Sequence, residues 1–351
     1  MNHERQSPGS QKRRWRYAGL AALLTPLLAV SWVKRERLWY TLFPSSATGS
    51  EARGATDEET RARRFTRDLR GYVVWSSNRH GNHDILMLTL PDWELRRLTT
   101  HPHPEYFPRV SPDGGRVVFA RGREPRASHR KQEAWDVHVL ELATGAERRI
   151  AEHATTPNWS ADGNKIYYVR ATDSALYEYD LASGREISLL RAGAPPMPGG
   201  VSLHEPDVSP RNDRVALTLR GATRMTALAS PGGAIERVGD GCQMAWSPDG
   251  SFLYWIDHGG RGENLVWRRD VAGGAPRAWL DLPEPFSHEY FPRMSRDARL
   301  LVLGASAGGH EHDRADYELF LWRIGTPAAE AVRLTFHSGN DNWPDLFLRG
   351  K

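Results

Sequence analysis

The chain has 351 residues, of which 39% are hydrophobic and 26% charged, so it is long enough to bury a substantial core. The formal net charge is only +4 and much of the arginine excess lies near the amino terminus, so the charge gives no indication of nucleic-acid binding. Cys242 is the only cysteine, which excludes a disulfide framework and a CxxC metal site.

The amino terminus predicts a membrane anchor. Residues 1–16 are polar and basic, and residues 17–33 are mostly apolar. A spanning helix needs about 20 residues, and basic residues ahead of an apolar stretch are typical of a secretory signal or signal anchor. More basic residues precede the stretch than follow it, which favours an amino terminus inside the cytoplasm. We expect an uncleaved anchor in the cytoplasmic (inner) membrane with the rest of the chain on the periplasmic side; the alternative is a buried hydrophobic helix.

Residues 34–70 are expected to form a tether between this anchor and a folded domain. From Pro44 the segment is rich in Ser, Gly, Ala, Arg and Glu, a composition typical of linkers. Asp57–Leu69 could also form a short charged helix.

A strand–turn–strand motif recurs through the rest of the chain. Its fullest copy, at residues 105–122, is EYFPRVSPDGGRVVFARG. Pro112-Asp113-Gly114 is a tight-turn sequence, and the flanking valines and Phe119 favour strands. The turn serines of this copy and of four further copies are Ser111, Ser160, Ser209, Ser247 and Ser295. Their spacing of about 38–49 residues indicates a propeller or another repeat array.

Each repeat contains four expected strands. The third strands begin near Asp84, Asp136, Ala175, Arg224, Asn264 and Glu318, which makes six units. The first unit lacks its own first strand, but Asn342–Leu348 aligns with Tyr106–Val110 on a shared proline. The sequence therefore predicts an all-β fold, a six-bladed β-propeller over residues 71–351. Its carboxy-terminal strand joins the first blade and leaves no open sheet edge.

The motifs YFPRVSPDGGRVVFA, TPNWSADGNKIYYV and AWSPDGSFLYWI resemble the WD-repeat-like units of the TolB-type β-propeller family. The resemblance covers roughly residues 71–350 and implies the architecture. TolB itself carries an additional amino-terminal α/β domain, so the chain resembles the family without being TolB. Propellers of this type include periplasmic binding scaffolds, domains of prolyl-oligopeptidase-like enzymes and some polysaccharide lyases.

Histidines and acidic residues gather near the predicted start of the inner strands. All histidines except His3 and His138 fall in second-to-third-strand loops or in links between blades, which share one face of a propeller. The residues expected around the channel mouth on this face are His103, Glu105, His204, Glu205, His288, Glu289, His337 and Asp341. They could bind a polar ligand or a divalent metal. The alternative is that the acids cap strand ends or pair with arginine.

The densest cluster is His310-Glu311-His312-Asp313. His310 and His312 would point the same way in an extended loop, so His310, His312 and Asp313 are the candidate metal ligands. Gly304-Ala305-Ser306-Ala307-Gly308 matches the GxSxG pattern, but no α/β-hydrolase sheet surrounds it, and no catalytic residue is assigned.

The leading hypothesis from the sequence is a membrane-anchored, periplasmic binding scaffold for a protein or a cell-envelope polymer. The alternative is a metal-assisted carbohydrate-active enzyme of the uronate-polymer lyase type that uses the His/acid face. A regulatory propeller beside a separately encoded hydrolase also stays open.

Overall fold

The computed structural model describes residues 56–350. The basic segment 1–16, the expected anchor at 17–33 and the first part of the expected tether lie outside the described residues. Between residues 56 and 350, no helix has the length and apolar character needed to span a membrane.

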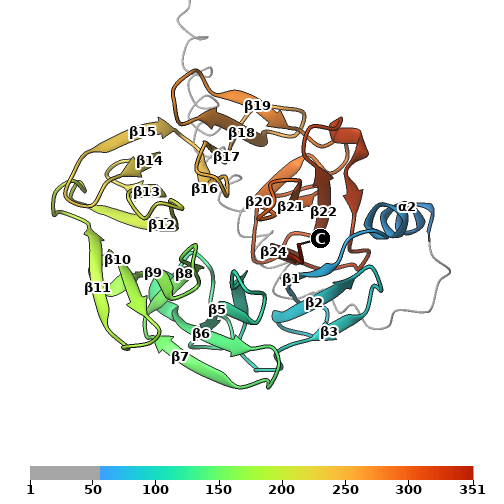
Figure 1. The fold of residues 1–351 in the computed structure, drawn as a ribbon, viewed down its shortest axis with the longest axis horizontal. Helices are drawn as coiled ribbons and strands as arrows, with labels where there is room; N and C mark the ends of the chain where they lie inside the picture. The colour runs from blue at the N-terminus through green and yellow to red at the C-terminus, as the bar shows by residue number, and fades with distance from the viewer. Residues whose placement is uncertain (1–55, 351) are drawn as a thin grey trace, which may run out of the picture. The chain divides into compact units, whose positions relative to one another are not determined.

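The described chain forms six four-stranded antiparallel blades around a central axis (Figure 1). Blade 1 contains β24 (Asp341–Leu348), β1 (Gly71–Ser77), β2 (Asp84–Leu90) and β3 (Leu95–Arg97). Blade 2 contains β4 (Glu105–Val110), β5 (Arg116–Gly122), β6 (Trp135–Glu141) and β7 (Glu147–Ala151). Blade 3 contains β8 (Ala154–Trp159), β9 (Lys165–Arg170), β10 (Ala175–Asp180) and β11 (Glu186–Arg191). Blade 4 contains β12 (Val201–Val208), β13 (Val215–Gly221), β14 (Met225–Ala229) and β15 (Ile235–Gly239). Blade 5 contains β16 (Cys242–Trp246), β17 (Phe252–His258), β18 (Asn264–Asp270) and β19 (Arg277–Leu280). Blade 6 contains β20 (His288–Met294), β21 (Leu300–Ser306), β22 (Tyr317–Arg323) and β23 (Val332–Arg333), and a single parallel pair, Asn264 with His288, joins it to blade 5.

The carboxy-terminal strand closes the ring, as the sequence predicts. β24 pairs antiparallel with β1, so that Val73 lies opposite Leu346. The first and last strands of the propeller therefore meet in blade 1 (Figure 1). Apolar side chains of adjacent blades pack together, as Val118 of blade 2 does with Ile166 and Tyr168 of blade 3.

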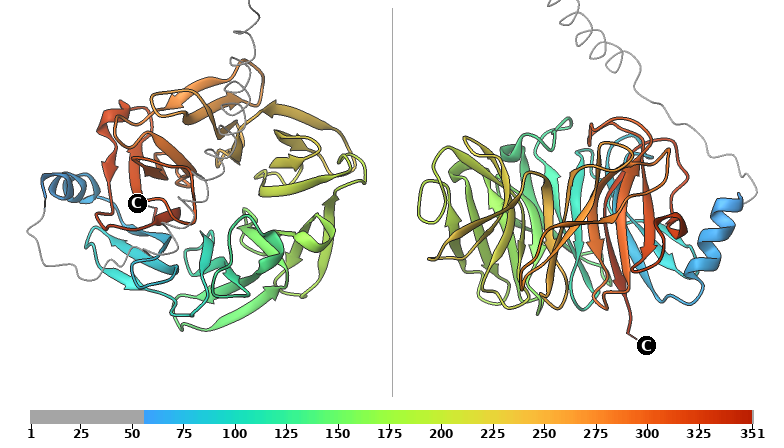
Figure 2. Two further views of the ribbon diagram at one scale, coloured as in Figure 1. Left: turned by 180° about the vertical axis from the view of Figure 1, so that it is seen from behind. Right: turned by 90° about the horizontal axis from the view of Figure 1, so that it is seen from above.

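The repeated serine motif builds one face of the ring, which we call the turn face. In the turn after β4, the Ser111 hydroxyl donates to Asp113 and accepts from the Arg116 backbone N–H at 2.9 Å. Ser160, Ser247 and Ser295 make the same pair of bonds in their own blades. The loops between second and third strands and the links between blades lie at the opposite end, the loop face. The edge-on view shows the blades standing side by side between these two faces (Figure 2).

Part of the expected tether is a packed helix. α2 (Asp57–Thr66) begins at Thr56, whose hydroxyl accepts a hydrogen bond from the Glu59 backbone N–H at 3.1 Å. Ala62 is buried among apolar residues of blades 6 and 1, and Trp93 donates to the Thr66 hydroxyl at 2.9 Å. The charged composition hid this contact, because the helix packs on the propeller through few apolar groups, the buried Ala62 and Thr66 and the partly buried Phe65.

Candidate functional site

The six innermost strands line the central channel, and each contains the same backbone irregularity. One residue in each strand has φ between 48° and 59°. These residues are Phe107, Thr156, Glu205, Gln243, Phe291 and Trp343. The pairing register shifts at each of these points, so each strand contains a β-bulge. Positive φ is unfavourable for these residue types, and its sixfold recurrence shows that the bulge is part of the repeat.

The loop-face end of the channel is filled. Tyr106, Phe107, Trp135, Phe291 and Trp343 form one buried aromatic cluster, in which the rings of Tyr106 and Trp343 stack with centroids 3.9 Å apart. The long loop between β5 and β6 lies over this cluster. It bonds to blade 4 through the Gln132 side chain, which donates to Leu203 O at 2.8 Å, and to blade 6 through the Ser128 hydroxyl, which donates to Asp313 at 2.6 Å.

The four predicted acidic residues do not form an open ring at this mouth. Glu105, Glu289 and Asp341 are 0% exposed. Glu105 pairs with Arg121, Glu289 accepts from the Leu282 backbone N–H at 2.6 Å, and Asp341 pairs with Arg79 at 2.6 Å. Glu205 accepts from the Gln243 backbone N–H at 3.1 Å. These carboxylates connect strand ends and links, which is the structural alternative that the sequence leaves open.

The four predicted histidines are distributed around the ring and do not converge. His103 Nδ1 lies 2.9 Å from Gly122 O, and His204 Nε2 lies 2.8 Å from the Ser202 hydroxyl. Burial lowers the pKa of His204 to about 4. Burial also lowers the pKa values of His288 and His337.

The candidate metal ligands have separate partners. His310 Nε2 lies 2.6 Å from Glu263, His312 Nδ1 lies 3.2 Å from the Tyr317 hydroxyl, and Asp313 pairs with His129 at 2.9 Å. Over residues 56–350, no three His, Cys, Asp or Glu side chains are grouped so as to hold a metal ion. The extended-loop geometry expected for His310 and His312 is absent, because residues 311–315 form a turn.

The turn-face half of the channel contains a charged chamber of about 180 Å³. The residues that follow the bulge in five of the six inner strands line it. They are Arg109, Asn158, Asp207, Arg293 and Asp345. Asp207 accepts from the Trp246 backbone N–H at 2.7 Å and lies 3.7 Å from Arg293, while Asp345 accepts from the Val110 backbone N–H at 2.8 Å.

Arg109 is the most deeply placed cation of the chamber. Arg109 is only 5% exposed. Its guanidinium Nη1 donates to Pro108 O at 2.8 Å and to Pro344 O at 3.4 Å. Its Nε has no hydrogen-bond partner among the described residues. Burial and the neighbouring charge of Arg293 lower the pKa of Arg109 to about 9.

One arginine crosses the mouth of the chamber. Arg296, in the turn after β20, donates to Pro112 O at 2.8 Å and to Ala161 O at 2.6 Å. It thereby connects blade 6 with blades 2 and 3 over the turn-face opening.

Comparisons with known proteins agree on the fold. No family model matches the chain. The structure of TolB from Acinetobacter baumannii superimposes with a TM-score of 0.59 at 13% identity, over 80% of this chain and 67% of that one. A putative TolB from Agrobacterium tumefaciens superimposes with a TM-score of 0.54 at 18% identity, over 80% of this chain and 98% of that one. The chain has the TolB-type β-propeller fold.

One curated protein also matches this TolB-type propeller in sequence. It is the uncharacterized protein Atu1656 of Agrobacterium fabrum, which is 25% identical over 105 residues. The match spans 28% of this chain and 36% of that relative, so it covers only about a third of the relative's length.

The sequence contained a signal for the chamber of the TolB-type propeller. Five of the six inner strands contain a proline, and the residue after it is Arg109, Asn158, Asp207, Arg293 or Asp345, whereas its neighbours in the motif are mostly apolar or turn residues. Charged or amide side chains at one fixed position of a repeat share one level of the channel, where they can hold a polar group. The chamber is smaller than the about 300–1,000 Å³ typical of small-molecule pockets, so it fits one side chain or a group of similar size.

Proposed function

We propose that this protein is a binding scaffold that takes a polar group of a protein or cell-envelope polymer into the turn-face chamber. The observation that carries the proposal is the chamber itself, where three arginines and two aspartates from four blades line one small cavity. Burying charged groups is costly unless they are paired, and Arg109 retains a buried N–H without a partner in the described chain. A bound polar group would supply that partner.

The scaffold is proposed to act at the periplasmic side of the inner membrane, where residues 17–33 would hold it. The basic and apolar pattern of the amino terminus supports this location. The fold shared with TolB supports a scaffold role for the propeller.

Affinity capture from detergent-solubilised membranes tests the chamber. Full-length protein and the variants Arg293→Gln and Asp345→Asn are compared, with Arg299→Gln as the matched control. Arg299 lies close to Arg293 in sequence but pairs with Asp297 outside the chamber. We expect both chamber variants to reduce recovery of the bound partner by about tenfold, because each removes a charged hydrogen-bonding group.

The melting temperature of each variant shows whether it is folded. Equal recovery with folded chamber variants and with wild type would remove the basis of the proposal. So would a loss shared by Arg299→Gln.

A further inference from the structure

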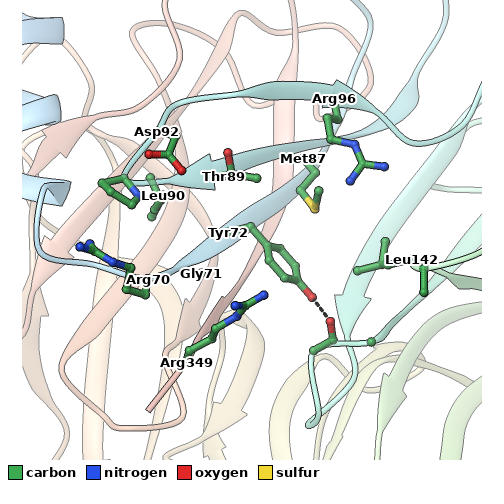
Figure 3. Close-up of a pocket in the computed structure, with 14 residues that line it drawn as sticks. Arg70, Gly71, Tyr72, Met87, Thr89, Leu90, Asp92, Arg96, Leu142 and Arg349 are labelled. Carbon is green, nitrogen blue, oxygen red and sulfur yellow. Dashed lines mark hydrogen bonds between the residues drawn. The ribbon is translucent and has the colours of Figure 1, made fainter. Parts of the chain in front are cut away.

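A second, larger cleft lies on the turn face, away from the channel. It has a volume of about 570 Å³ and lies where blade 1 meets blade 2. Residues from β1, β2 and β3, from the turn after β4, from the turn after β6 and from the carboxy-terminal end line it. Figure 3 shows the Tyr72 ring in the middle of the cleft, with Arg349 and Arg96 on either side of it.

The floor of the cleft is apolar and rigidly held. Tyr72, Met87 and Leu90 are 8%, 4% and 4% exposed, and the half-buried Leu142 extends the floor into blade 2. The Tyr72 hydroxyl donates to Gly114 O at 2.6 Å, which fixes the ring against the neighbouring blade (Figure 3). Among the described residues, the side chains of this floor therefore offer apolar contact and leave no free hydrogen-bond donor.

The rim of the cleft is basic. Arg70, Arg96 and Arg349 come from three separate parts of the chain, and among residues 56–350 Asp92 is the only acidic residue that lines the cleft. Within residues 56–350, none of these arginines forms an ion pair. Arg97, the next residue along β3, pairs with Asp84 at 2.8 Å. Because successive side chains of a strand point to opposite faces, Arg96 projects away from that pair.

We propose that this cleft binds an acidic peptide segment of a partner protein, with an apolar side chain on the floor and flanking carboxylates on Arg96 and Arg349. This rests on the proposed scaffold function and names the chemistry of a protein partner. Arginine presents a planar fork that matches a carboxylate with two parallel hydrogen bonds. The volume lies within the range of ligand pockets, about 300–1,000 Å³. A sugar chain would present hydroxyl groups to a floor of Met87, Leu90 and Leu142 that cannot hydrogen-bond with them, so the lining favours a peptide.

Fluorescence anisotropy with labelled peptides tests the proposal on the full-length protein in detergent. The probe contains Glu-Leu-Glu in a Gly/Ser background, and its matched peptides contain Gln-Leu-Gln or Glu-Ser-Glu. We expect the neutral peptide to bind about tenfold or more weakly, because it lacks charge-assisted bonds to two arginines. The Glu-Ser-Glu peptide should also bind more weakly, and higher salt should weaken binding of the acidic probe.

Protein variants separate the cleft from the rest of the surface. Arg96→Gln combined with Arg349→Gln should weaken binding of the Glu-Leu-Glu peptide by about tenfold or more. Arg185 is an exposed residue in a tight turn of blade 3, and Arg185→Gln should leave binding of this peptide unchanged. Arg96→Glu combined with Arg349→Glu should instead prefer a Lys-Leu-Lys peptide, a gain that a misfolded protein could not show.

The outcomes also separate this site from the chamber. Equal binding of acidic and neutral peptides, an equal loss with Arg185→Gln, or tighter binding of tetragalacturonate than of the peptide would each overturn the proposal. Arg293→Gln should not affect peptide binding. If the peptide fails to bind while Arg293→Gln still loses the captured partner, the cleft proposal falls and the scaffold function stands.

Discussion

At the residue scale, buried carboxyl groups hold strand ends in place, but they do so with different partners. Glu105 bonds to Thr99 and Arg121, and Glu318 bonds in the same way to Thr335 and Arg333. Glu289 has no such cation: one oxygen accepts from the Leu282 backbone N–H, and the other has no partner among the described residues. Burial raises the pKa of Glu289 to about 8.

The buried Glu289 should make stability depend on pH. Its pKa in the folded protein lies above the ordinary value, so between about pH 4.5 and 8 the folded state keeps a proton that the unfolded state releases. Stability should therefore fall as pH rises through this window. Glu289→Gln should reduce this loss of stability with rising pH. At pH 8 the free energy of unfolding of the variant should exceed that of the wild type by ~1–3 kcal/mol.

Urea unfolding at pH 5, 6.5 and 8 measures this difference. Glu124→Gln, in an exposed loop, is the matched control and should follow the wild-type curve. Parallel pH curves for Glu289→Gln and wild type would contradict the assignment.

At the scale of elements, the strand that closes the ring carries much of the cohesion of blade 1. Leu346 of β24 is 5% exposed and belongs to a core that includes Leu300 and Val302 of blade 6. The bonds between β24 and β1 join positions more than 260 residues apart, such as Val73 and Leu346. The closure therefore depends on contacts between the two ends of the propeller.

Shortening Leu346 should weaken the closure. Leu346→Ala removes buried methyl groups between blades 1 and 6 and should lower the free energy of unfolding by ~2–4 kcal/mol. Leu348→Ala, in the same strand but only partly buried, should cost less, about 1 kcal/mol. Chemical denaturation of the two variants gives the comparison, and equal losses would show that β24 does not close the core as described.

At the scale of the whole molecule, the two faces of the propeller have different properties. The loop face is closed by an aromatic cluster and by a loop that reaches blades 4 and 6. The turn face contains both the charged chamber and the basic cleft. The sequence prediction placed recognition on the loop face, and the structure moves our proposal to the turn face.

The proposed location requires that the full chain fractionate with membranes. We expect it to resist extraction with high salt and to be released by detergent, because residues 17–33 are apolar. A chain that starts at residue 49 should remain in the supernatant. Extraction of the full chain by salt alone, or protection of the propeller inside spheroplasts from added protease, would contradict the anchor or its orientation.

Much of the fold was predictable from the sequence because each repeat carries local signals. The turn serines mark five blades, and the proline shared by β4 and β24 predicts the closure. The sequence predicts a tether at helix α2 because most of its residues are charged, and its contacts with the propeller come from two small residues, Ala62 and Thr66, and the single aromatic residue Phe65. The site was predicted less well, because Glu105, Glu289 and Asp341 have the same sequence pattern whether they line a mouth or anchor a strand.

The sequence by itself determined the number of blades and the turn geometry, since these depend on turn residues and strand patterns within about 50 positions. It also determined how the ring closes, because the proline shared by β4 and β24 marks β24 as the missing strand of blade 1. Only the tertiary structure decided which charges meet. Arg109, Asp207 and Asp345 are far apart in the chain and become neighbours because the bulge in each inner strand directs the same repeat position into the channel. Likewise, Arg70 and Arg349 line one cleft only because the two ends of the propeller are joined in blade 1.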